Sequence, residues 1–249
     1  MVPAFTLGCT KNHQMNFAFS ETVTIPGHPS IAVFSPATCA WPELLSRMND
    51  LAGSSQPTAH FVQLYKRTTE QAALFYEDTD RETREFIEQL QTRFAAIFFE
   101  AWYLNEAGAA VPGHWQMFFH CRNLKPVQYS LLASNAHVNG DVCEALTDKF
   151  TEEEIRRQYT SFLCYNKGLL PVYDEFYQQV FQCSTSVRIL HYLSAGLSKR
   201  YGYRCLRQWR RRQIELALLH YRHPTRFRLR MKWHRIKMKI IDQLIIHCV

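Results

Sequence analysis

The chain has 249 residues, of which 47% are hydrophobic and 14% aromatic. This composition supplies enough apolar surface for a large core and excludes an intrinsically disordered chain. Nine glycines and ten prolines are few for this length, which argues against a β protein with many turns. The charge is uneven. From Lys199 onward there are 15 basic residues and two acids, a net charge of +13, whereas the rest has 14 basic and 20 acidic residues, a net charge of −6.

The cysteine pattern and the lengths of the apolar runs indicate the cellular compartment of the protein. The eight cysteines are scattered without a Cys-x-x-Cys pair, which argues against a zinc ribbon or a disulfide scaffold. Reduced thiols of this kind are typical of the cytoplasm. Residues 1–9 lack the basic and apolar regions of a signal peptide, and no run approaches the ~18 apolar residues that span a bilayer. We therefore expect a cytoplasmic protein, with peripheral membrane binding left open.

In chain order, residues 1–40 contain four prolines and predict an irregular N-terminal arm. Helical spacing of apolar residues, with capping residues at the ends, then predicts a series of helices. They cover 41–52, 58–76, 80–107, 114–121, 126–147, 151–182 with a kink at 168–171, 184–202, and 203–221. Together they predict an all-α fold: a single multi-helix bundle domain over 41–222, of about seven or eight helices.

Residues 223–249 form a basic C-terminal segment whose secondary structure is ambiguous. Phe227, Leu229 and Met231 alternate with basic residues as in a strand, but Leu229, Trp233 and Ile236 also have helical spacing. No partner strand is evident, so we expect a basic amphipathic helix. Such a helix suits an anionic membrane surface or an acidic protein. Nucleic acid ranks lower because no groove-reading motif is present.

The stretch 126–147 is the candidate site. It is apolar almost all round, which predicts a buried helix, yet it holds Asn135, His137, Asn139 and Asp141. Unpaired buried polar groups cost about 1–3 kcal/mol each, so such a cluster is either fully hydrogen bonded or functional. At 100° per residue, His137 and Asp141 share one face and the asparagines lie on the opposite, apolar face. One pocket holds all four only if this helix is the centre of the bundle. Gly140, mid-helix, predicts that another backbone or a ligand approaches there.

The spacing His137-x-x-x-Asp141 places an imidazole and a carboxylate one helical turn apart. Three interpretations stay open: a purely structural hydrogen bond, a base with its orienting acid, or two ligands of a divalent metal such as Zn, Fe or Mn. A metal needs further ligands, for which Glu100 is the first candidate. The other candidates are His114, His120 and Asp174.

The residues 135–141, Asn-Ala-His-Val-Asn-Gly-Asp, also carry a resemblance. They match the Asn-Ala-His-[Ile/Val]-Asn-x-Asp signature of a bacterial all-helical family known as a domain of unknown function. Weaker matches lie in 98–104, 115–118, 162–169 and 206–210, so the resemblance covers about 58–220. It implies an all-helical domain with its site at the Asn-His-Asp cluster, and it brings no established reaction.

Two hypotheses for the function follow. In the first, the protein is an enzyme, metal-assisted in one version, that acts on a small or lipid-like molecule at a buried site. His137 and Asp141 would be catalytic or metal ligands, and Asn135, Asn139 and Asn166 would bind substrate. In the second, the cluster is structural, and the protein is a non-enzymatic scaffold that binds an anionic surface or a partner protein through residues 223–249. A pocket lined by His137 and Asp141 would favour the enzyme, and a filled core the scaffold.

Overall fold

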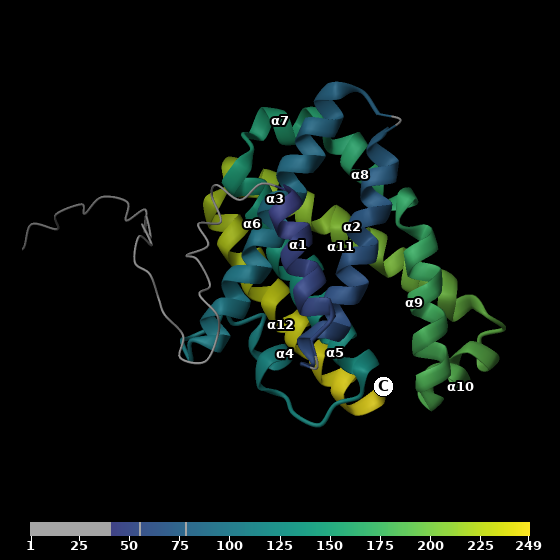
Figure 1. Ribbon diagram of the computed structural model, residues 1–249. Coiled ribbons are helices and arrows are strands. Elements are labelled where there is room, and N and C mark those ends of the chain that lie inside the picture. Colours follow the sequence, from purple (N-terminus) through teal and green to yellow (C-terminus); the bar gives the residue numbers. More distant parts are fainter. Residues whose placement is uncertain (1–40, 55, 78) are drawn as a thin grey trace, which may run out of the picture. The chain divides into compact units, whose positions relative to one another are not determined.

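The computed structural model describes residues 41–54, 56–77 and 79–249, and these residues form helices without any strand (Figure 1). The helices are α1 (Trp41–Ala52), α2 (Thr58–Glu77), α3 (Arg81–Glu106), α4 (Gln116–His120), α5 (Pro126–Ala136), the π-helical turn η1 (His137–Asp141), α6 (Val142–Lys149), α7 (Glu152–Arg157), α8 (Tyr159–Gly168), α9 (Leu170–Cys183), α10 (Thr185–Leu193), α11 (Leu197–Arg222) and α12 (Pro224–Cys248). The all-α prediction is confirmed. The arm expected over residues 1–40 lies outside the described residues.

Two helix starts follow from the capping residues that the sequence offers. Asp80 precedes α3, and its Oδ1 accepts a hydrogen bond of 2.8 Å from the backbone N–H of Thr83. Thr151 and Glu154 form a capping box at the start of α7. Each such cap satisfies backbone donors that the helix leaves free and is worth about 1 kcal/mol.

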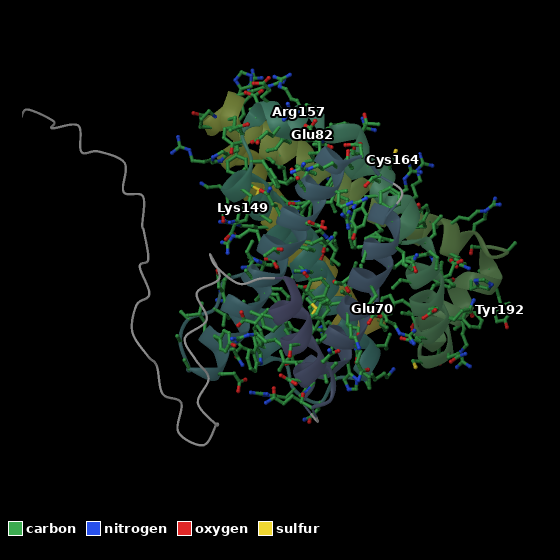
Figure 2. The ribbon with its side chains drawn as sticks, turned by 45° about the horizontal axis from the view of Figure 1, so that its top comes forward. Glu70, Glu82, Lys149, Arg157, Cys164 and Tyr192 are labelled. Carbon is green, nitrogen blue, oxygen red and sulfur yellow. The ribbon has the colours of Figure 1, made fainter. Side chains whose placement is uncertain are left out.

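The helix expected over 151–182 is divided into α7, α8 and α9, and the one expected over 126–147 is divided by η1 into α5 and α6, so the described residues form more helices than predicted. At the first break, the Gln158 amide bridges to α3, where it contacts Thr83 Oγ1 at 3.2 Å and Glu82 Oε1 at 3.3 Å. Glu82 also pairs with Arg157 at 2.5 Å at this end of the bundle, as labelled in Figure 2. At the second break, Pro171 lies in the first turn of α9, where its missing N–H costs nothing.

The boundary predicted at Gly202 is wrong. The turn lies earlier, over 194–196, where Ala195 and Gly196 have positive φ angles of 49° and 83°. Glycine adopts this left-handed conformation without strain, so Gly196 separates α10 from α11. Gly202 lies inside α11, where an added Cβ would overlap the Tyr173 hydroxyl. That glycine therefore serves close helix packing.

The bundle is arranged around the continuous rod α5–η1–α6. α2 and α12 pack on its first part, and α3 and α11 pack on its second part. α12 runs antiparallel to the rod, since the Gln128 amide donates to the Ile245 carbonyl, while Asn135 donates to that of Met238. Figure 1 shows α12 in yellow beside α5, and α9 and α10 in green at one edge of the bundle. None of the helices described is both long enough and apolar enough to cross a bilayer.

Candidate functional site

The central rod is not an ordinary α-helix, because it contains a π turn over His137–Asp141. A π turn adds one residue to the helical repeat and widens the helix locally, and such turns occur frequently at functional sites. It begins at the candidate histidine and ends at the candidate aspartate. Since α2, α3, α11 and α12 surround the rod, it lies at the centre of the bundle, as the sequence interpretation requires.

Asp141 is fully buried, with both carboxylate oxygens hydrogen bonded. Its Oδ2 lies 2.8 Å from His137 Nδ1, and its Oδ1 lies 2.6 Å from His114 Nε2. The Trp115 indole N–H donates to the same Oδ1 at 3.2 Å. Burial raises the pKa of this carboxyl, but the hydrogen bonds and charges of His114 and His137 outweigh it and hold the pKa below its ordinary value. Asp141 is therefore a buried carboxylate anion at neutral pH.

His137 is 3% exposed, and burial lowers the pKa of its imidazole, a shift that the bond to Asp141 opposes. The nearby cation Arg210 lowers this pKa further. The ring is therefore neutral at neutral pH. Because a carboxylate only accepts hydrogen bonds, Nδ1 carries the proton and Nε2 carries the lone pair. Nε2 is buried without any hydrogen-bond partner.

Aromatic rings enclose this imidazole. Phe94 stacks on it with ring centroids 3.4 Å apart, and Tyr65 meets it edge-on at 4.5 Å. Phe61, Phe98 and Trp115 complete the enclosure, with centroids 5.6–6.3 Å away. These rings exclude bulk water from the lone pair of Nε2, which strengthens any polar interaction made there.

Further unpaired polar atoms lie on α2, the helix that carries Phe61 and Tyr65. The Tyr65 hydroxyl and the Thr69 Oγ1, one helical turn apart, are both buried without hydrogen-bond partners. Burial raises the pKa of Tyr65 well above its ordinary value, so this hydroxyl stays protonated. The Arg210 guanidinium packs over the rings of Phe162 and Tyr165, at 5.0 and 4.7 Å. Buried unpaired polar groups are rare in proteins and call for a ligand, a water or a chemical role.

The two asparagines belong to a different network, on the far side of the rod. Asn139 Nδ2 donates to Asn135 Oδ1 at 2.9 Å, and Asn135 Nδ2 donates to Asp242 Oδ1 at 2.7 Å. His234 Nε2 lies 2.7 Å from the Asn139 carbonyl oxygen. The network thus joins the rod to α12. The hydrogen bonds of the two asparagine side chains go to each other and to α12, and whether they bind substrate stays a prediction.

The remaining candidates lie apart from the pair. Glu100 Oε1 accepts a hydrogen bond of 2.6 Å from Arg93, which also pairs with Asp148 on α6 at 2.8 Å. Asn166 lies in α8, but its side chain is outside the described residues. In the part of the chain that the structure describes, no three His, Cys, Asp or Glu side chains are grouped as a metal ion requires. Among the described residues, His137 and Asp141 thus have no third side chain placed to complete a metal site with them.

A surface pocket of about 390 Å³ lies between α2 and α9. It is lined from α2 by His60, Gln63, Leu64, Lys66, Arg67 and Glu70, the last of which is labelled in Figure 2. Phe61 and Tyr65 face His137 from the other side of the same helix. This pocket is therefore separated from the His137–Asp141 pair by α2.

Sequence reasoning missed several residues around the pair. Trp115, Tyr65, Thr69 and Arg210 come from α2, α11 and the segment before α4, and nothing in their local spacing relates them to His137. His114 was considered only as a metal ligand, and its hydrogen bond to Asp141 was not foreseen. Gly140, a glycine in the middle of a helix, was the one sequence feature that indicated a close approach by another group. The group that approaches Gly140 in the structure is the His114 ring.

Comparison with known proteins places the chain in a family. The model of a family of unknown function, DUF5995, matches residues 42–235. The chain belongs to this family, which confirms the resemblance seen in the sequence. No curated protein and no solved structure matches the chain.

Proposed function

We propose that this member of the DUF5995 family is an enzyme in which neutral His137 acts as a general base on a small molecule held in the bundle core. One observation carries the proposal: Nδ1 of His137 is fixed by Asp141, while Nε2 is buried and unpaired. An unpaired buried acceptor costs about 1–3 kcal/mol. His234 also has an unpaired buried nitrogen, Nδ1, but its other nitrogen lies against the Asn139 carbonyl oxygen, whereas that of His137 is held by a carboxylate. A catalytic base needs one nitrogen held and the other free.

The arrangement supports proton transfer. When Nε2 takes a proton, the imidazolium that forms lies against the Asp141 carboxylate, 2.8 Å from Nδ1. Asp141 does not need to move, since His114 and Trp115 hold its other oxygen. Fixed charges of this kind stabilise a developing positive charge without reorganisation. Asp141 is thus the orienting group and His137 the base.

The surroundings indicate the substrate class. The Tyr65 hydroxyl, which has no hydrogen-bond partner, offers binding to a polar group, whereas Phe61, Phe94 and Phe98 offer an apolar wall. A small molecule with a polar head and an apolar body fits both, and this class includes lipid-like compounds. Because His137 is 3% exposed, entry requires the helices around it to part.

A metal-assisted version of the proposal has less support. Both oxygens of Asp141 already accept hydrogen bonds, and Glu100 is paired with Arg93. A metal held by His137 alone would need further ligands that the described residues do not group there. Metal analysis of protein purified without a histidine tag tests this version. A stoichiometric metal that is lost in His137→Ala would support it over the metal-free base.

The test of the base compares His137→Gln with His234→Gln, a buried histidine outside the enclosure. Wild type and variants are incubated with pools of small polar and amphiphilic metabolites, and consumption is followed by mass spectrometry. General-base catalysis contributes about 10²–10⁴-fold, so His137→Gln should slow turnover at least a hundredfold and His234→Gln only a few-fold. Equal turnover by wild type and His137→Gln would overturn the proposal.

A second candidate function is a non-enzymatic scaffold, favoured by the burial of the pair and by the position of the pocket on the far side of α2. In a scaffold, His137 joins η1 to α3 by stacking on Phe94 and to Asp141 by its hydrogen bond. His137→Gln would then lower the melting temperature without loss of any turnover. ¹⁵N NMR separates the two: a base requires an unprotonated Nε2 at neutral pH whose signal shifts on ligand binding.

A further inference from the structure

The outward face of α12 carries an exposed apolar stripe. Large hydrophobic side chains recur every three or four residues along the helix and are 47–61% exposed. They are Leu229, Trp233, Ile236, Ile240 and Leu244. At 100° per residue they span a face about 80° wide. An exposed, continuous apolar stripe of this kind marks an interaction surface.

Basic residues flank the stripe on both sides. On the helical wheel, Arg228, Lys232, Arg235 and Lys239 lie on one side, and Arg226, Arg230 and Lys237 lie on the other. All seven are exposed. The one acid of α12, Asp242, is buried on the opposite face, where it is bonded to Asn135. The outward face is therefore apolar along its centre and purely cationic at its edges.

The inward face fixes this orientation. His234, Met238, Asp242 and Ile245 are buried against the bundle, and the asparagine network ties them to the central rod. The stripe is therefore presented outward by a helix that is already packed, and it is not the unused core face of a loose helix.

We propose that the outward face of α12 binds the surface of an anionic lipid bilayer, with the helix axis parallel to the membrane plane. Helices that lie in the interface combine an apolar stripe with flanking Lys and Arg, which meet acidic headgroups. Trp233, in the N-terminal half of the stripe, is of the residue type that prefers the headgroup level.

Charge complementarity decides the choice of partner. Cations line both edges of the stripe from Arg226 to Lys239, which fits a plane of negative charge better than a single acidic groove. The remaining part of this chain does not supply the counter-charge, since residues 1–40 contain one glutamate and one lysine. The inference is independent of the proposed function, because an enzyme or a scaffold could equally dock in this way.

The experiment is vesicle co-sedimentation of the full chain with phosphatidylcholine alone and with phosphatidylcholine containing phosphatidylserine. We expect binding to the anionic vesicles only, weakened by salt. Trp233→Ser with Ile240→Ser should weaken it at least fivefold, and Lys232→Glu with Lys239→Glu about tenfold. The matched control is Lys149→Glu with Arg188→Glu, the same change in net charge on α6 and α10, which should change binding less than twofold. Lys149 is labelled in Figure 2.

Three outcomes would overturn the proposal: no binding of the wild type to anionic vesicles, equal weakening by the control pair, or binding of an acidic polypeptide through these residues in place of vesicles. The last would assign the surface to an acidic protein. Because the changed side chains point outward, circular dichroism should show unaltered folding. A fluorescence change on vesicle binding that disappears in Trp233→Phe would place the stripe itself at the lipid.

Discussion

Gly140 and the imidazole of His114 occupy adjoining space, so that a Cβ at position 140 would overlap the ring. The contact holds His114 where its Nε2 reaches Asp141. Gly140→Ala should therefore displace His114. Overpacking costs about 1–3 kcal/mol and outweighs the gain in helix propensity of about 1 kcal/mol. Denaturant unfolding measures the loss. Gly113→Ala, which meets open space, is the control and should change stability by less than about 0.5 kcal/mol. A stabilised Gly140→Ala would contradict the packing.

Asp141→Asn preserves the shape of the side chain but places an amide N–H against a donor from His137, His114 or Trp115. We expect a loss of about 2–4 kcal/mol, since a buried ionic hydrogen bond is broken. The pKa of His137 should fall further, because Asp141 raises it in the wild type. NMR titration and urea unfolding check both effects. Asp148→Asn, on an exposed carboxylate of α6 paired with Arg93, should cost less than about 1 kcal/mol.

Tyr65→Phe removes a buried hydroxyl that has no hydrogen-bond partner. Deleting such a group relieves a desolvation cost, so stability should stay unchanged or rise by about 1 kcal/mol. Tyr165→Phe is the matched control. The Tyr165 hydroxyl accepts a hydrogen bond of 2.8 Å from Gln91 Nε2, so its removal should destabilise the protein. If Tyr65→Phe is equally stable but loses ligand binding or turnover, the hydroxyl is functional. Destabilisation by more than about 1 kcal/mol would show that it is already satisfied.

Asp242 gives a pH dependence with a defined sign. Burial raises its pKa to about 6, although the bond from Asn135 opposes the shift. The folded state thus retains a proton that the unfolded chain releases near pH 4, and folding becomes less favourable as pH rises from about 4 to 6. Asp242→Asn should match the wild type below pH 4 and exceed its stability by about 1–2 kcal/mol above pH 6.

Comparing Asp242→Asn with the wild type at each pH isolates this group from His137 and His234. Burial lowers the pKa of both imidazoles, so their effect on stability has the opposite sign to that of Asp242. They destabilise the fold as pH falls below about 6.5. Their contribution is common to both proteins and cancels in the difference. Thermal unfolding from pH 4 to 8 supplies the data, and a difference that shrinks with rising pH would refute the assignment.

The sequence predicted the fold class and most helix starts, because caps and apolar spacing are local signals. Asp80 and Thr151 begin α3 and α7 as expected. Breaks set by tertiary contacts were missed. Gln158 ends α7 where its amide reaches α3, and Gly202 continues α11 because it packs against Tyr173. Helix propensity alone predicts neither of these contacts between helices.

The geometry around the candidate site could be predicted in part for the same reason. The pair His137–Asp141 is local, and its hydrogen bond could be anticipated from a spacing of four. The partners from other segments depend on helix packing and could not be anticipated from spacing. They are His114 and Trp115, which bond to Asp141, and Tyr65, which neighbours His137. The wheel correctly placed Asn135 and Asn139 away from His137, but only the structure shows that they bind α12.

The π turn divides the central rod into two segments whose side chains are out of phase by one residue. Residues before His137 are positioned for α2 and α12, and those after Asp141 for α3 and α11. Because the turn takes up one extra residue, deleting a residue inside it would restore a regular α-helix and leave α6 in nearly the same orientation relative to α5. Deleting a residue within α5 or α6 would instead rotate the two segments relative to each other by about 100°, and one set of neighbours would lose its fit. The rod therefore tolerates a change in its length more readily at this turn than on either side of it.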